Sequence, residues 1–262
     1  MNMPGARVET ETVEVGSVAG RTLLADLYRP PEPNGCGVLL VHGGAWIQGD
    51  LTQLRGYGIL LGRIGYTCLA CEYRLAPDAH WPAQIDDVNT ALSYLHGRAA
   101  SLGIAPEKIA VSGNSAGGHI ALMAAARPVA PIAAVVAFYP PTDLVAGRDR
   151  GATPLMSALF GHDPSTAELA AASPVTYASA SFPPALLITG NNDELVSWHD
   201  SDDMYHRLRA AGAKAELHVF EGLPHAFDRL PDYGRHCANL IALFLDRHVR
   251  DPRAITAPAV TV

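Results

Sequence analysis

The chain has 262 residues, of which 48% are hydrophobic and 17% are charged, and it carries a formal net charge of -7 at pH 7. This length and hydrophobic content suit a single domain over residues 1–262 with a substantial core better than a disordered chain. The acidic balance gives no electrostatic reason to expect nucleic acid or a membrane surface as a partner, and no apolar run is long enough to span a bilayer.

The chain begins with two strand-like stretches and continues with alternating strand and helix patterns. Residues 8–15 alternate apolar and polar side chains, and residues 21–28 follow after a short turn region, so the two stretches predict an antiparallel pair. Six short apolar runs then predict strands buried on both faces, at residues 37–44, 67–74, 108–115, 133–140, 185–193 and 215–222. Helical spacing of apolar residues occurs between and after these runs, for instance at residues 57–64, 85–95 and 237–245. The pattern predicts an α/β fold with a mostly parallel sheet of about eight strands, the first pair antiparallel, and helices on both faces.

Residues 141–183, between the fourth and fifth of the six apolar runs, form a long segment without a strand pattern. An insertion of this kind is typical of an active-site lid, so we expect a small cap over a site at the carboxyl ends of the strands. Its apolar stretch PLMSALFG, residues 154–161, contains Leu155 and Phe160. This stretch forms either ordinary helix packing or the wall of a substrate pocket.

The four cysteines indicate neither a disulfide framework nor a metal site. They are Cys36, Cys68, Cys71 and Cys237, too few for a disulfide scaffold in a chain of this length. Cys68 and Cys71 form a C-x-x-C pair, but they lie in a strand pattern in which residues three apart point to opposite faces. We therefore expect buried, reduced cysteines and no metal. Because the N-terminal residues show no secretion signal, we also expect a cytoplasmic protein.

The stretch IAVSGNSAGGHIALMAAA, residues 109–126, runs from a strand pattern through a serine flanked by glycines into a helix pattern. Ser115 is the central residue of the motif G-x-S-x-G, between Gly113 and Gly117. A sharp strand-to-helix turn strains such a serine, pushes its hydroxyl out of the backbone and leaves no room for large neighbours. The motif predicts a nucleophile, which requires a histidine and an acid to activate it.

Two later loops at strand ends supply the histidine and the acid. His225 follows the last predicted strand in a loop rich in glycine and proline, and Asp193 follows the strand before it. Together with the serine they give the chain order serine, acid, histidine, which is one of the known orders of a catalytic triad. Glu194, Asp143 and Asp200 are alternatives for the acid, and we select Asp193 for its loop position.

A turn after the first of the six buried strands predicts a site for negative charge. When a serine attacks a carbonyl, charge collects on the carbonyl oxygen, and preorganised backbone N–H groups are required to stabilise it. Gly43 and Gly44 in this turn, and Ala116 beside the nucleophile, are small enough to leave their amides open. We assign these three residues to an oxyanion hole and expect His42, in the same turn, to be a structural hydrogen-bonding residue.

Several further side chains near the predicted strand ends are candidates for contact with a substrate. Aromatic residues at such places line a pocket about as often as they pack in the core. The candidates are Trp46, Asn114, Leu155, Phe160, Leu195 and Phe227. His119 lies one helical turn after Ser115, and we expect it to be a packed or hydrogen-bonded neighbour rather than the base.

Five ordered motifs resemble those of the α/β-hydrolase superfamily, namely HGGAW, YRLAP, GNSAGG, TGNNDELV and GLPHAF. They extend over nearly the whole chain and look most like the motifs of the hormone-sensitive-lipase-like and feruloyl-esterase-like carboxylesterases. The resemblance implies an α/β-hydrolase fold and a serine carboxylesterase that hydrolyses small esters, with short-chain acyl or aryl groups, through an acyl-enzyme and without a cofactor. Ala45 stands where the fuller family motif H-G-G-G has its last glycine.

Two other functions stay open at this point. HGGAW also resembles the arylformamidases, which implies an amide substrate. A non-catalytic, hydrolase-like binding protein would keep the pocket and could dispense with the nucleophile or the base, but the joint presence of Ser115, Asp193 and His225 favours an enzyme. The expected partner is a small-molecule ester, and a homo-oligomer is compatible with the sequence.

Overall fold

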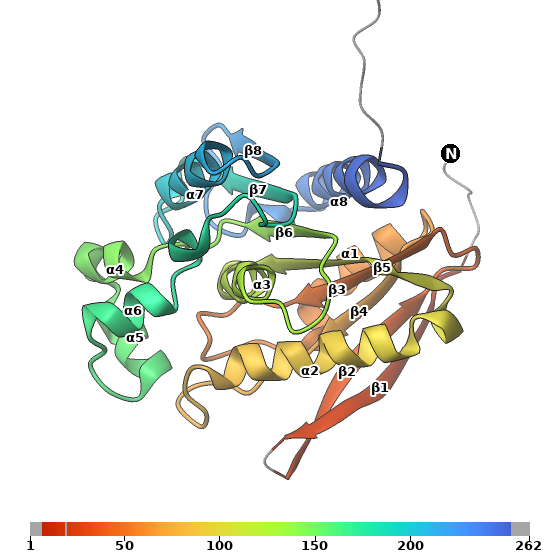
Figure 1. The fold of residues 1–262 in the computed structure, drawn as a ribbon, viewed down its shortest axis with the longest axis horizontal. Coiled ribbons are helices and arrows are strands. Elements are labelled where there is room, and N and C mark those ends of the chain that lie inside the picture. Colours follow the sequence, from red (N-terminus) through yellow and green to blue (C-terminus); the bar gives the residue numbers. More distant parts are fainter. Residues whose placement is uncertain (1–6, 19, 253–262) are drawn as a thin grey trace, which may run out of the picture.

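An eight-stranded sheet runs through the centre of the protein (Figure 1). The computed structural model describes residues 7–18 and 20–252. Along the sheet the strands follow the order β1-β2-β4-β3-β5-β6-β7-β8. Their bounds are β1 (Glu9–Val18), β2 (Arg21–Arg29), β3 (Gly35–Val41), β4 (Thr67–Cys71), β5 (Ile104–Asn114), β6 (Ala134–Phe138), β7 (Ala185–Gly190) and β8 (Ala215–Phe220). β1 pairs with β2, and β2 with β4, in antiparallel fashion, whereas β3 to β8 are parallel, which confirms the predicted sheet.

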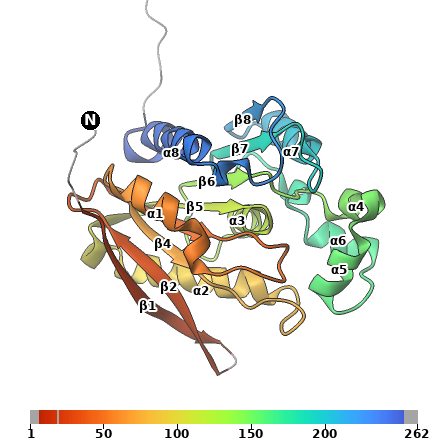
Figure 2. The ribbon, with the colours of Figure 1, turned by 180° about the vertical axis from the view of Figure 1, so that it is seen from behind.

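Helices cover both faces of this sheet, as the alternating pattern predicts. They are α1 (Arg55–Gly62), α2 (Ala83–Arg98), α3 (Ala116–Ala126), α4 (Leu144–Gly147), α5 (Thr153–Phe160), α6 (Thr166–Ala171), α7 (Trp198–Ala210) and α8 (Pro231–Leu245). Shorter helical turns occupy Leu51–Leu54, Ala100–Leu102, Arg148–Ala152, Pro174–Tyr177, Phe227–Arg229 and Asp246–Arg250. α2 and α3 lie in front of the sheet in Figure 1, and α1 and α8 lie in front in Figure 2, which is the view from behind. Within the described residues, no helix combines the length and apolarity that crossing a bilayer requires.

The side chains of the central strands alternate between two cores, one on each face of the sheet. In β3, Leu39 joins the core under α2, α3 and α7, whereas Leu40 joins the core under α1 and α8. This alternation is the geometry of an extended strand. Cys71 and Cys68 are divided in the same way between the two cores, so the C-x-x-C pair is split by the sheet. All four cysteines are buried free thiols, as the sequence predicts.

The segment 141–183 folds into α4, α5 and α6, which lie together beyond one end of the sheet (Figure 1). Asp143 begins α4, because its carboxylate accepts a hydrogen bond from the Ala146 N–H at 3.0 Å. Ser165 and Glu168 begin α6 with a reciprocal capping box, in which each side chain accepts from the other's backbone N–H. These caps stabilise short helices that would be marginal in isolation.

Candidate active site

Ser115 occupies a sharp turn between β5 and α3, as the motif predicts. Its backbone has φ 55° and ψ -120°, a strained conformation for a residue with a side chain. The two motif glycines are required by close packing. A Cβ on Gly113 would lie 2.2 Å from the carbonyl oxygen of Gly117, and a Cβ on Gly117 would lie 2.1 Å from that of Val41. The Ser115 N–H donates to the Phe138 carbonyl at 2.8 Å, which ties the turn to the neighbouring strand β6.

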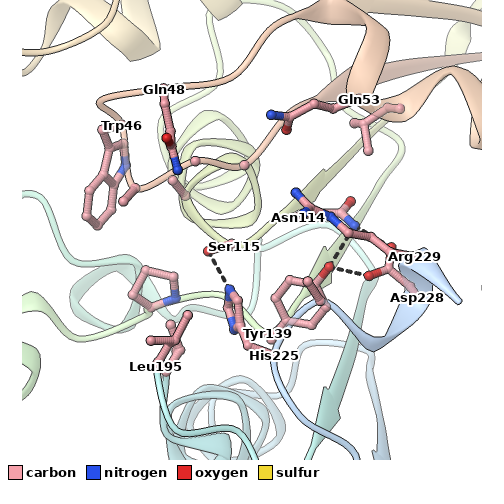
Figure 3. A pocket seen from close by; sticks show the side chains of 18 of the residues that line it. Trp46, Gln48, Gln53, Asn114, Ser115, Tyr139, Leu195, His225, Asp228 and Arg229 are labelled. Atoms are coloured by element: carbon pink, nitrogen blue, oxygen red, sulfur yellow. Dashed lines mark hydrogen bonds between the residues drawn. The ribbon is translucent and has the colours of Figure 1, made fainter.

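The structure brings the three predicted triad residues together in one hydrogen-bonded series. The Oγ of Ser115 lies 3.0 Å from the Nε2 of His225 (Figure 3), and the Nδ1 of His225 lies 2.6 Å from the Oδ2 of Asp193. A proton on Nδ1 satisfies the carboxylate and leaves Nε2 free to accept the serine proton. The other oxygen of Asp193 accepts from the N–H groups of Leu195 and Val196, each at 2.9 Å, so the loop itself orients the acid.

None of the alternative acids contacts the histidine. Asp143 is engaged at the start of α4, as described above, and Glu194 is exposed on the wall of the pocket. Asp200 is buried and pairs with the guanidinium of Arg150 at 2.5 Å, and its burial raises its pKa to about 6. Among the four carboxylates considered from the sequence, Asp193 alone is placed to orient His225.

The turn after β3 lies directly against the nucleophile. A Cβ on Gly43 would lie 2.7 Å from the Asn114 carbonyl oxygen, and a Cβ on Gly44, where φ is 122°, would lie 1.9 Å from the Gln48 carbonyl oxygen. Both positions therefore require glycine. In the described part of the chain, no group accepts a hydrogen bond from the backbone N–H of Gly43, Gly44 or Ala116. The three amides predicted to form an oxyanion hole are free to bind a ligand oxygen.

Two buried histidines near the site are held by backbone carbonyls. His42 donates from Nδ1 to the Gly43 carbonyl at 2.7 Å, and burial lowers its pKa. His119 donates from Nε2 to the Ala172 carbonyl at 2.7 Å and accepts from the Trp46 indole at 3.3 Å. Burial lowers the pKa of His119 to about 4, so its ring is neutral at pH 7. Both residues have the structural environment that the sequence predicts for them.

A pocket with a volume of about 1380 Å³ opens over Ser115 and His225. Of the predicted substrate contacts, Trp46, Asn114, Leu155 and Leu195 line it. The amide of Asn114 is already engaged, because it donates to the Tyr139 hydroxyl at 3.0 Å and to the Asp228 carboxylate at 2.7 Å. Asn114 therefore presents part of its surface to the pocket while its polar group is turned into the protein.

Two predicted substrate contacts lie in the cores instead of on the pocket wall. Phe160, at the end of α5, is 9% exposed and packs in the core that includes α2 and α3. Phe227 is 2% exposed. The centroid of its ring lies 5.9 Å from the ring centroid of Tyr139 and 5.0 Å from that of Phe220. Neither residue lines the pocket, because the backbone directs each ring inward to bury it.

A buried cluster around Asp228 was not predicted from the sequence. Asp228 is 8% exposed, and its carboxylate accepts from three side chains: the hydroxyl of Tyr139 (Figure 3), the hydroxyl of Tyr57 and the amide of Asn114. The cluster contacts the site at two places. Asn114 directly precedes Ser115, and the ring centroid of Tyr139 lies 4.5 Å from that of His225. Burial next to Asp228 raises the pKa of Tyr139 well above its usual value, so this phenol remains a donor.

Asp228→Asn should lower the free energy of unfolding by about 2 kcal/mol, because an amide in place of the carboxylate leaves one of three buried donors without an acceptor. Tyr57→Phe is the matched control, since it removes one donor and leaves the carboxylate with Tyr139 and Asn114. We expect it to cost about 1 kcal/mol. Urea denaturation measures both, and an Asp228→Asn protein as stable as the wild type would show that the cluster does not hold the site.

Metal ligands are not grouped in the described part of the chain. Residues 7–18 and 20–252 contain no set of three or more His, Cys, Asp or Glu side chains placed to hold a metal ion.

The strained serine at a strand-to-helix turn, and the histidine and aspartate on loops after the last two parallel strands, are the defining features of an α/β-hydrolase. The comparisons with known proteins agree with this class. The BD-FAE family model matches residues 25–208, which is most of the chain. The chain belongs to the BD-FAE family.

Similar proteins carry names of ester hydrolases. The chain is 32% identical over 237 residues to "Probable carboxylic ester hydrolase LipM" of Mycobacterium tuberculosis, covering 80% of this chain and 54% of LipM. It is 32% identical over 235 residues to ethyl acetate hydrolase of Pseudomonas putida, covering 80% of this chain and 73% of that enzyme. The structure named "Bacterial Heroin Esterase" superposes with a TM-score of 0.80 at 25% identity, covering 93% of this chain and 85% of the other. The chain spans only about half the length of the mycobacterial relative.

Proposed function

We propose that this chain is a serine carboxylesterase that hydrolyses small carboxylic esters, with short-chain acyl or aryl groups, through an acyl-enzyme. The observation that carries the proposal is the hydrogen-bonded series from Asp193 through His225 to Ser115, with three unengaged amides beside the serine. Support for small esters comes from the name of the Pseudomonas putida relative, ethyl acetate hydrolase. The reaction would need no cofactor, because these residues supply the nucleophile, the base and the oxyanion stabilisation.

In the proposed acylation step, the Oγ of Ser115 attacks the ester carbonyl carbon while Nε2 of His225 takes the hydroxyl proton. Asp193 holds the ring through Nδ1 and stabilises the imidazolium that forms. The carbonyl oxygen becomes negative and accepts hydrogen bonds from the open amides. The carbon–oxygen bond to the alcohol then breaks, His225 returns the proton to the leaving alcohol, and the acyl group remains on Ser115.

Deacylation would use the same residues with water as the nucleophile. His225 takes a proton from water, and the resulting hydroxide attacks the acyl carbonyl carbon while the amides again stabilise the oxygen. The bond from the acyl carbon to the Oγ of Ser115 then breaks. The histidine returns its proton to Oγ, so the carboxylic acid leaves and the free enzyme is restored.

We also propose that residues 141–183 act as a small cap on the site. Gly147, Leu155 and Met156, from α4 and α5, line the same pocket as His225. A segment in this place would shield the acyl-enzyme from bulk water and shape the space available to the ester.

A cytoplasmic location is a further proposal. Its support is the state of the four cysteines, which are all buried free thiols. Reduced cysteines are typical of proteins that work in a compartment where disulfides do not persist.

The test of the proposed function compares phenyl acetate with formanilide, an aryl ester with an aryl formamide, using wild-type protein and Ser115→Ala as the background control. We expect kcat/KM to be higher for the ester and turnover to require Ser115. Faster hydrolysis of formanilide would identify an amide hydrolase. No turnover above background on phenyl acetate, a short-chain aryl butyrate or formanilide would favour a binding protein.

A further inference from the structure

The pocket has two sides of contrasting chemistry around Ser115. Trp46 and Leu195 lie on one side of the serine in Figure 3, and Gln53 and Arg229 lie on the other. The first side has the apolar side chains of Trp46 and Leu195, and the apolar residues Ala152, Leu155, Met156 and Val196 also line the pocket. This side suits a hydrocarbon part of an ester, because apolar side chains exclude water without offering hydrogen bonds.

The second side is formed by α1, by the turn that precedes it and by the start of α8. The lining residues here include Gly56 and Leu60 of α1 and Arg63, the residue that directly follows α1, and their spacing places them on one helical face. The turn before α8 adds Arg229, and α8 adds Arg235. We call this side the arginine arm and define it by Gln53, Arg63, Arg229 and Arg235.

Two of the three arginines in this arm have no acidic partner. Arg235 pairs with Asp232 on its own helix. In residues 7–18 and 20–252, neither Arg63 nor Arg229 has a carboxylate oxygen within salt-bridge distance, and both side chains are exposed. The nearby buried carboxylate of Asp228 is already satisfied by three donors. The arm therefore presents two available cations in a chain whose net charge is -7.

We propose that the arginine arm binds a carboxylate borne by one part of the ester substrate, so that the preferred substrates are anionic esters. A guanidinium offers a planar pair of N–H donors that matches a carboxylate, and such charge-assisted hydrogen bonds are stronger than neutral ones. The proposal rests on the proposed esterase function. It adds the substrate class: an ester with its reactive carbonyl at Ser115, a hydrocarbon part against Leu155 and Leu195, and a carboxylate toward Arg63 and Arg229.

Two matched pairs of esters test this proposal and identify which part of the substrate carries the charge. Mono-para-nitrophenyl glutarate and para-nitrophenyl valerate differ in a carboxylate at the end of the acyl part. Para-acetoxybenzoate and para-tolyl acetate differ in a carboxylate on the alcohol part. The readout is the ratio of kcat/KM for the anionic ester to that for its neutral partner, at low and high salt.

We expect this ratio to fall about tenfold in one of the pairs when Arg63→Gln and Arg229→Gln are combined, and to fall in the wild type when salt is added. Arg98→Gln is the control, because Arg98 is an exposed arginine on α2 outside the pocket. It should leave both ratios unchanged. Ratios that change by less than twofold in both pairs would overturn the arginine arm.

The failure of the arm and the failure of the esterase are distinguishable. If the neutral esters are hydrolysed while the ratios stay fixed, the arm is rejected and the esterase stands. If none of the four esters is hydrolysed, the arm is tested by calorimetry, which measures the affinity of para-acetoxybenzoate for the wild type and for the double variant. Binding weakened about tenfold in the variant supports it, and equal or undetectable binding overturns it.

Discussion

Ser115→Ala should lower kcat/KM for a phenyl or para-nitrophenyl ester by about a millionfold, because the triad acts as a unit and loses its nucleophile. The Oγ of the hydroxyl is the only heavy atom removed, and it lies 3.0 Å from the Nε2 of His225. The backbone N–H of residue 115 would still donate to the Phe138 carbonyl, so the turn should persist. Steady-state hydrolysis with stopped-flow and long-incubation assays covers the required range.

The folding control for this variant is thermal unfolding followed by circular dichroism. We expect the melting temperature to stay close to that of the wild type, because alanine fits wherever the serine side chain fits. A folded Ser115→Ala protein that retains a tenth of the wild-type kcat would show that another residue is the nucleophile.

Asp193→Asn should lower kcat by about ten-thousandfold while substrate binding is preserved. The wild-type Oδ1 accepts from two backbone amides, at Leu195 and Val196. An asparagine keeps these bonds by placing its oxygen there, which turns its NH₂ group toward the Nδ1 of His225. That group donates, so the ring is held with its proton on Nε2 and cannot accept the proton of Ser115. Measured kcat and KM on one aryl ester separate the two effects.

Two matched carboxylate variants control for the charge change. Glu194→Gln and Asp143→Asn should alter kcat by less than about tenfold, because neither carboxylate contacts the histidine. The order of the effects decides the assignment. A crippled Asp143→Asn protein beside a mildly affected Asp193→Asn protein would mean that the acid lies on the loop after β6.

The predicted strands and the triad follow from local patterns in the sequence. Parallel strands buried on both faces give apolar runs that are easy to recognise, and a nucleophile turn demands small residues at fixed spacing around Ser115. Asp193 and His225 lie on the loops after β7 and β8. These two loops are on the same edge of the sheet because β7 and β8 are parallel and their carboxyl ends point the same way. The burial of a strand and the tight packing of a turn each restrict the residues of one short stretch, so both features can be recognised from the sequence.

The pocket wall could not be predicted in the same way, since it depends on which face of a segment turns inward. Leu155 and Phe160 are five residues apart on α5, which places them about 140° apart around the helix axis. Leu155 therefore lines the pocket while Phe160 packs in the core. Proximity to a strand end also did not distinguish Phe227, which is buried, from Leu195, which is exposed.

Contacts between distant parts of the chain were also beyond the sequence. Asp228 accepts hydrogen bonds from Tyr57, Asn114 and Tyr139, which belong to three different elements or loops. Nothing in the stretch around Asp228 distinguishes it from a solvated acid. The arginine arm has the same origin, because Arg63 and Arg229 line one pocket only when α1 packs against α8.

The most direct test of the central claim, an activated nucleophile at Ser115, is covalent labelling by a fluorophosphonate followed by intact-protein and peptide mass spectrometry. The geometry predicts one adduct per chain, on the peptide that contains Ser115, and loss of that reactivity in a His225→Ala protein because the hydroxyl then has no base. An unlabelled wild-type protein, an adduct on a different residue, or labelling of Ser115 that persists without His225 would contradict it.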